Sequence, residues 1–256
     1  MRRSIMSELN SSSPPPWEPG SDAERVLSRL HALSERQMHA PGFRLHRLRR
    51  VLSGWLGAGA PDWNGPAMRR YMRDKLVALD PDKSRFCYLL ARARSASRIV
   101  EVGTSFGVST IYLAAAVRHN TLVTGRPGLV IGTENEPSKA ERARSNLADA
   151  GLAHWVEVRE GDFRTTLRDI REPIDLVLMD IWAPLARPAL DMLVPHLREG
   201  AMIICDNIVA ARREYRDYLE LVRDPANGFA SITLPFEGGL ELSVRLIEEA
   251  TMPEPG

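Results

Sequence analysis

The chain has 256 residues, 44% of them hydrophobic and 26% charged, with a formal net charge of +1 at pH 7. This length allows one large domain with a substantial core, or one domain with an N-terminal extension. The near-neutral charge lacks the basic excess that is typical of nucleic-acid binders, so we expect no nucleic-acid partner. Cys87 and Cys205 lie far apart and form no CxxC motif. This argues against a disulfide scaffold or a zinc site and favours a reducing compartment.

The sequence shows no membrane or export signal. No apolar run approaches the ~18–20 residues that span a bilayer. The first residues are basic and then rich in Ser and Pro, without the apolar segment of a secretory signal. We therefore expect a cytoplasmic protein without a membrane partner.

The first part of the chain predicts an arm followed by helices. Residues 1–20 contain SSSPPPWEPG, which can build neither helix nor sheet, so we expect them to be disordered. Ser21 begins a capping box with Glu24 at its third helical position. Helices are predicted from 21 to about 38, around 43–56, over 66–78, and from Asp80-Pro81 onward. We expect residues 21–97 to form a helical cap over the active site.

From Arg98 the sequence alternates short apolar strands with amphipathic helices, which indicates βαβ units. The strands are RIVEVG, GLVIGTE, WVEVRE, IDLVLMD and AMIICDN, followed by helices from about 107 and over 138–150, 163–170, 186–197 and 211–222. FASITLP and LELSVRLI then predict a hairpin. The expected fold is α/β: a Rossmann-like, doubly wound, mostly parallel seven-stranded sheet with a C-terminal antiparallel hairpin and an N-terminal helical cap. The core spans 98–248, and 249–256 form a flexible tail.

The strand ends carry the residues of a cofactor site, because open α/β sheets bind ligands beyond the carboxyl ends of their strands. The first strand ends in EVGTSFG, where glycines let the backbone turn tightly and approach a ligand. The second strand ends in Glu134, at the position of a usual acceptor for ribose hydroxyls. The third leads to Asp162 and Phe163, a carboxylate for an exocyclic amine and a ring to cover a base.

A nicotinamide dehydrogenase is the competing interpretation, but Glu-x-Gly-x-x-x-Gly differs from the Gly-x-Gly-x-x-Gly of a pyrophosphate loop. EVGTSFG, IGTENEP and EGDF resemble the three successive cofactor motifs of class I S-adenosylmethionine-dependent methyltransferases. The resemblance places the methionine part at the first motif, the ribose at Glu134 and the adenine at Asp162 and Phe163. The predicted cofactor-binding residues are Glu101, Gly103, Thr104, Ser105, Gly107, Ser109, Glu134, Asn135, Gly161, Asp162, Phe163 and Asp180. The product would be S-adenosylhomocysteine.

Two further strands end in carboxylates, Asp180 in LVLMDIW and Asp206-Asn207 in IICDN. Two carboxylates and an amide oxygen are hard ligands that suit Mg²⁺ or another divalent cation. The arrangement resembles the metal site of the catechol and caffeoyl-coenzyme-A O-methyltransferases, over roughly residues 80–247. That resemblance implies a metal held by Asp180, Asp206 and Asn207. It also implies a catalytic role for Asp180, a small hydroxylated aromatic substrate and a homodimer.

One departure concerns the lysine that the catechol enzymes carry three residues after the metal-binding acid. Here that position is Ala183, and the nearby Arg187 cannot serve as a base because guanidinium keeps its proton. Deprotonation of the acceptor would then rely on the metal or on water, or the acceptor is not a simple catechol. A metal-independent methyltransferase for another oxygen or nitrogen nucleophile is the alternative. A non-catalytic module that only binds the cofactor is a third interpretation.

Aromatic residues are candidates for the substrate pocket. Trp182 follows the metal-binding acid closely, and Trp55 and Trp63 lie in the N-terminal part where this family builds its substrate lid. Ordinary packing explains Trp182 equally well.

Overall fold

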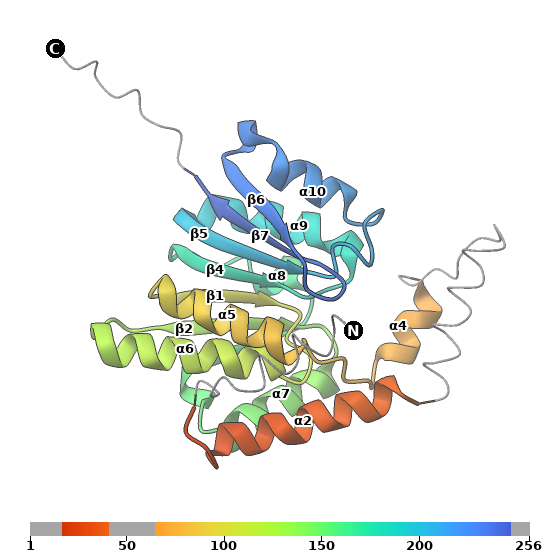
Figure 1. The fold of residues 1–256 in the computed structure, drawn as a ribbon, viewed down its shortest axis with the longest axis vertical. Helices are drawn as coiled ribbons and strands as arrows, with labels where there is room; N and C mark the ends of the chain where they lie inside the picture. The colour runs from red at the N-terminus through yellow and green to blue at the C-terminus, as the bar shows by residue number, and fades with distance from the viewer. Residues whose placement is uncertain (1–16, 41–64, 247–256) are drawn as a thin grey trace.

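The structure, a computed structural model, describes residues 17–40 and 65–246 of the chain. Its centre is a seven-stranded sheet with the order β3-β2-β1-β4-β5-β7-β6 (Figure 1). The strands are β1 (Arg98–Val102), β2 (Leu129–Glu134), β3 (Val156–Glu160), β4 (Ile174–Met179), β5 (Leu197–Asp206), β6 (Phe229–Leu234) and β7 (Leu240–Arg245). The first five strands are parallel, whereas β7 runs antiparallel to both β5 and β6. The predicted parallel sheet with a C-terminal antiparallel hairpin is confirmed.

Helices cover both faces of the sheet, which explains why its central strands are apolar on both sides. The described helices are α2 (Asp22–Met38), α4 (Pro66–Met72), α5 (Pro81–Ala93), α6 (Val108–Thr124), α7 (Pro137–Asp149), α8 (Phe163–Thr166), α9 (Ala183–Leu193) and α10 (Arg216–Arg223). Successive strand residues point to opposite faces. Ile99 accordingly belongs to the hydrophobic cluster that includes residues of α5 and α6, and Val100 to the cluster that includes residues of α8, α9 and α10. Figure 1 shows α5 and α6 in front of the sheet and α8 and α9 behind it.

Two helices from the region before residue 98 belong to this packed body. Leu27 and Leu30 of α2 are buried in the same cluster as the sheet, and α2 packs against α6 and α7. Helix α5 packs along α6. The described part of residues 21–97 therefore helps to build one helical layer of the fold. That this region forms a cap over the active site stays a prediction.

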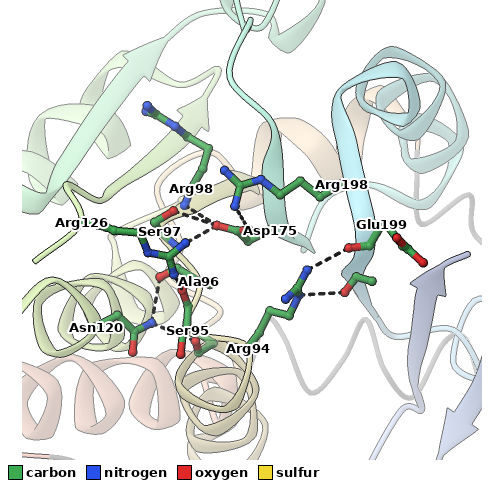
Figure 2. Close-up of polar contacts among 12 residues, drawn as sticks. Arg94, Ser95, Ala96, Ser97, Arg98, Asn120, Arg126, Asp175, Arg198 and Glu199 are labelled. Atoms are coloured by element: carbon green, nitrogen blue, oxygen red, sulfur yellow. Dashed lines mark hydrogen bonds and ion pairs between the residues drawn. The ribbon is translucent and has the colours of Figure 1, made fainter. Parts of the chain in front are cut away.

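Polar contacts at the amino ends of the strands fix the turn from α5 into β1 (Figure 2). The Asp175 carboxylate on β4 accepts hydrogen bonds from the backbone N–H groups of Ser97 and Arg98, at 2.7 and 2.9 Å. The Arg198 guanidinium of β5 donates to the same carboxylate at 2.8 Å. Asn120 of α6 donates to two carbonyls near this turn. These contacts align β1, β4 and β5 at the end of the sheet opposite to the predicted site.

Helix α4 ends earlier than predicted, at Met72 rather than near residue 78. The backbone beyond it finds partners on α2 instead of within a helix. The N–H of Leu76 donates to Gln37 Oε1 at 2.6 Å, and the N–H of Ala78 donates to Ser34 Oγ at 3.0 Å. Tertiary hydrogen bonds therefore replace the helical ones that the local sequence favoured.

Other boundaries also shift. Helix α8 stops at Thr166, α9 starts at Ala183 and stops at Leu193, and α10 starts only at Arg216. A 3-10 turn over Val194–His196 contains Pro195, which lacks the N–H needed to continue α9, and β5 begins directly after it. The predicted helix over 43–56 lies outside the described residues. Among the described helices, none is both long and apolar enough for a bilayer span.

Candidate active site

Four chain segments meet at the carboxyl edge of the sheet, where the strand order reverses between β1 and β4. The last residues of β1, β4 and β5 pair with one another in register. Gly103 and Asp180 directly follow β1 and β4, and Asp206 ends β5, so these three residues lie side by side. The Asp180 N–H donates to the Val102 carbonyl at 3.0 Å. Glu134 ends β2, the next strand on the other side. This switch point is where open α/β sheets bind ligands.

The loop after β1 is held tightly against its neighbours. Gly103 has φ +104°, and a Cβ built there would lie 2.1 Å from the Asp180 carbonyl oxygen. The Glu134 carboxylate accepts a hydrogen bond from the N–H of Ser105 at 2.8 Å and another from the N–H of Glu136 at 2.8 Å. Ser105 itself has φ 50°, in the left-handed region. Glu134 thus joins the β1 loop to the β2 loop on one side of the switch point.

Glu101 is fully buried and faces the start of α6. Its carboxylate accepts hydrogen bonds from Ser109 Oγ at 2.5 Å, from Thr104 Oγ1 at 3.0 Å and from the Thr110 hydroxyl. Burial raises the pKa of Glu101, while these three hydroxyl donors act against that rise. The acid predicted to flank the methionine part therefore secures the loop and the first turn of α6, which begins after Gly107 at φ +86°.

The residues predicted at the adenine follow the ends of β2 and β3, which pair in parallel. Asp162 caps α8 by accepting from the N–H of Arg164 at 2.8 Å, and its carboxylate also pairs with the Arg164 guanidinium at 3.0 Å. The Phe163 ring is buried in the core cluster that includes α9. Asn135 is exposed, and Gly161 has φ +124°. The Phe163 ring therefore packs in the core, whereas the Asp162 and Asn135 side chains are exposed at the surface beside it.

At the other side of the switch point a lysine enters the predicted metal site. The Lys83 ammonium lies 2.5 Å from Asp206 Oδ1, and these two side chains are only 5% and 7% exposed. Asn207 Nδ2 donates to Asp206 Oδ2 at 3.0 Å. Lys83 also interacts electrostatically with Asp180. The lysine comes from α5, a segment on which no functional residue was predicted.

Burial is the largest cause of the pKa shifts of the Asp180 and Asp206 carboxyl groups. It raises the pKa of Asp180, and the negative charges of Asp206 and Glu101 raise it further, while Lys83 and Lys139 act in the opposite direction. Burial likewise raises the pKa of Asp206, and Lys83 opposes the rise. The two acids are close enough to influence each other, as the parallel pairing of β4 and β5 predicts.

The residues present do not offer three free oxygen ligands to a metal. Both Asp206 oxygens already accept hydrogen bonds from Lys83 and Asn207. The Asn207 Oδ1 lies 2.8 Å from the point where a Cβ of Gly238 would stand, so its amide oxygen is turned toward that turn. Within residues 17–40 and 65–246, no three His, Cys, Asp or Glu side chains gather as a metal site. The structure brings Asp180, Asp206 and Asn207 together, but the arrangement does not fit the predicted Mg²⁺ site.

Comparison with known proteins agrees with this geometry. Residues 100–208 match the model of a family described as a methyltransferase domain. This stretch runs from β1 through Asp206 and Asn207, the whole carboxyl edge described above. Residues 100–208 therefore form a methyltransferase domain.

Two relatives of this chain are catechol O-methyltransferases. It is 36% identical over 134 residues to the one from Mycobacterium tuberculosis, covering 52% of this chain and 58% of the relative. It is 30% identical over 137 residues to the one from Niastella koreensis, covering 52% and 59%. The chain therefore spans less than two thirds of these relatives' length. Its fold is similar to that of the O-methyltransferase TomG from Streptomyces achromogenes in complex with SAM, with a TM-score of 0.59, 25% identity and coverage of 78% and 98%.

The described residues include one of the three aromatic residues that were predicted for the substrate pocket. Trp182 is half-buried and stands at the N-cap of α9, two residues after Asp180. Both packing and a pocket wall fit this position. Trp55 and Trp63 lie outside the described residues.

From the sequence, no role was assigned to Lys83. A signal existed: Lys83 precedes Cys87 and Ala91 by four and eight residues, so all three share one face of α5. Cys87 and Ala91 are fully buried. A lysine on the apolar stripe of a helix is the kind of residue that needs a buried partner.

Proposed function

We propose that this methyltransferase transfers a methyl group from S-adenosylmethionine to a hydroxyl of a small aromatic molecule. The observation that carries the proposal is the carboxyl edge of the sheet. There a glycine loop and Glu134 stand on one side of the switch point, and Asp180 and Asp206 stand on the other. The similarity to two catechol O-methyltransferases over about half of the chain supports the choice of oxygen as acceptor.

The cofactor would lie across the β1 loop. A carboxylate has about four acceptor positions, and two backbone N–H groups occupy only two of those on Glu134. The remaining positions suit the two hydroxyls of a ribose. The half-buried Ser105 and the exposed Asn135 border the same carboxylate from the two loops. The methionine end would then point toward Gly103 and Asp180.

When bound, S-adenosylmethionine supplies a sulfonium methyl whose C–S bond breaks as the acceptor oxygen forms the new C–O bond, leaving S-adenosylhomocysteine, a methyl ether and a proton. Among the described residues, no side chain donates a hydrogen bond to the half-buried Asp180 carboxylate. Asp180 can therefore accept one from the acceptor hydroxyl and orient its oxygen. Such positioning is worth up to about 7–11 kcal/mol of a barrier.

The proposal has two versions. The first is the metal-assisted reaction that the resemblance implies, with Mg²⁺ held by Asp180, Asp206 and Asn207. The second is a metal-independent methyl transfer, and the position of Lys83 on Asp206 favours it. Transfer to another oxygen or to a nitrogen nucleophile is the alternative for the acceptor.

The test is methyl transfer from labelled S-adenosylmethionine to a panel of aromatic hydroxyl compounds, including vicinal diols, with the methylated atom assigned by NMR. We expect a methyl ether, and a fall of about 10²-fold in the rate for Asp180→Asn, because an amide oxygen is a weaker hydrogen-bond acceptor than a carboxylate and orients the hydroxyl less well. Asp191→Asn is the matched control, since Asp191 forms an exposed pair with Arg187 on α9. Methylation of amines alone would favour the alternative acceptor. Failure to bind S-adenosylmethionine would refute the proposal altogether.

A further inference from the structure

Lys83 is held in place by the start of α5. The Asp80 carboxylate caps this helix, accepting hydrogen bonds from the N–H groups of Asp82 at 2.9 Å and Lys83 at 3.4 Å. Pro81 occupies the first helical position, where its fixed φ suits the helix. The backbone of Lys83 is thus anchored, and its side chain runs inward with 5% of its surface exposed. The ammonium group is a built-in part of the site.

This position is unfavourable for a lysine unless a partner compensates it. A positive charge in the first turn opposes the helix dipole, and burying an ammonium group removes its hydration. Asp206 provides the direct contact, and Asp180 adds a second negative charge from the neighbouring strand end. Two buried carboxylates so close together themselves need a cation, because their charges repel.

We propose that the Lys83 ammonium takes the place of a divalent cation at the Asp180–Asp206 pair, so that this site works without a metal. Lys83 is then a positioning residue: it offsets one of the two negative charges and fixes the Asp206 carboxylate, while the half-buried Asp180 stays available to the acceptor. The exclusion of metal stands on this geometry alone. Only the consequence for methyl transfer rests on the proposed function.

A divalent ion could enter only by displacing the ammonium group. The adjacent turn of α5 presents the fully buried Cys87 toward the two acids, so an apolar wall lies beside the ammonium group. With Lys83 in place, an incoming cation also meets its positive charge. Removing the ammonium group would leave two carboxylates and an amide, a ligand set that suits Mg²⁺ or Mn²⁺.

The experiment is a Mn²⁺ titration followed by electron paramagnetic resonance, on the full chain without cofactor or acceptor. We expect no saturable Mn²⁺ binding by the wild-type chain. Lys83→Met should gain a site, with an affinity at least about tenfold higher, which is about 1.4 kcal/mol. Lys75→Met is the matched control, because Lys75 pairs with Asp74 near the surface, and it should behave as wild type.

Saturable Mn²⁺ binding by the wild-type chain with the affinity of Lys83→Met would overturn the proposal, and so would a folded Lys83→Met that binds no Mn²⁺. If Lys83→Met does not fold alone, Lys83→Gln keeps a donor to Asp206 and removes only the charge, and the same gain of binding is expected. Because no methyl transfer is measured, these results stay separate from the fate of the proposed activity.

Discussion

Gly103 is the residue at the site that tolerates a side chain least. A Cβ there would stand 2.1 Å from the Asp180 carbonyl oxygen and 2.7 Å from Ile181 Cγ2. We predict that Gly103→Ala lowers the free energy of unfolding by more than the ~1–2 kcal/mol of positive-φ strain alone. Gly151→Ala is the control, because Gly151 has φ +68° but nothing within 4 Å of its added Cβ. Urea unfolding of both variants measures the difference, and equal losses would contradict the close approach of the two strand ends.

Glu134 is the residue on which we expect cofactor affinity to depend most. Glu134→Ala removes the acceptor for the ribose hydroxyls and the two backbone bonds that fix the loops. Hydrogen bonds to a charged group contribute about 1.5–3 kcal/mol, so the Kd for S-adenosylhomocysteine should rise roughly 10- to 100-fold. Calorimetric titration measures this. Glu136→Ala is the control, because it removes a neighbouring carboxylate that pairs with Arg73, and its Kd for S-adenosylhomocysteine should stay unchanged. An unchanged Kd for Glu134→Ala would contradict the assigned ribose site.

For single residues, the sequence predicted the acids at the strand ends but not the side chains that they contact. Glu134, Asp180 and Asp206 could be identified because each ends a strand, and the carboxyl ends of parallel strands share one edge. The inward turn of Glu101 toward three hydroxyls follows from strand alternation and could have been anticipated. Lys83 could not be placed on Asp206 from spacing alone, because that contact joins segments 123 residues apart through the packing of α5 on the sheet.

Among the elements, β7 carries a buried acid that ties the C-terminal hairpin to α10. Glu241 is 0% exposed in its side chain and accepts two hydrogen bonds from the Arg223 guanidinium, at 2.8 and 2.9 Å. Burial alone would raise the pKa of Glu241, but its bonds with Arg223, Thr233 and Ser231 hold it below the ordinary value of 4.5. A carboxyl with a depressed folded pKa stabilises the fold above its unfolded pKa, and this contribution is lost as the pH falls through the folded value.

We therefore predict that Glu241→Gln lowers the free energy of unfolding at pH 7 by about 1.5–3 kcal/mol. The difference from wild type should shrink once the pH falls below the ordinary value of 4.5. Urea unfolding over a pH series measures it. Glu220→Gln on α10 is the control, since Glu220 forms an exposed pair with Arg216 and should change little. A loss that does not depend on pH would show that the carboxylate charge contributes nothing.

Hydrophobic periodicity predicted whether each element is a helix or a strand better than it predicted where the element ends. The strands β1 to β7 appear where apolar runs predicted them, and the pattern is strongest in β1 and β4, which are buried on both faces. The end of α4 depended on tertiary partners, and the end of α9 on Pro195. The hydrogen bonds that end the helical region after α4, from Leu76 and Ala78 to α2, have no local signal.

For the whole molecule, the two layers of helices leave the carboxyl edge of the sheet as the place where chemistry-bearing residues converge. The class of fold and the location of the site could be predicted, because topology alone sends strand ends to one edge. The homodimer and the cytoplasmic location stay predictions. The acceptor could not be predicted, because the shape of its pocket depends on loop conformations that do not follow from the sequence pattern.

We propose that this edge transfers methyl groups with Lys83 as its resident cation. The most direct test is the initial rate of methyl transfer to an aromatic hydroxyl by the wild-type chain after EDTA treatment, compared with the rate after Mg²⁺ is restored. We expect the same rate in both conditions, because the Lys83 ammonium group already occupies Asp206 and offsets part of the negative charge of the pair. A rate that vanishes with EDTA and returns with Mg²⁺ would contradict it.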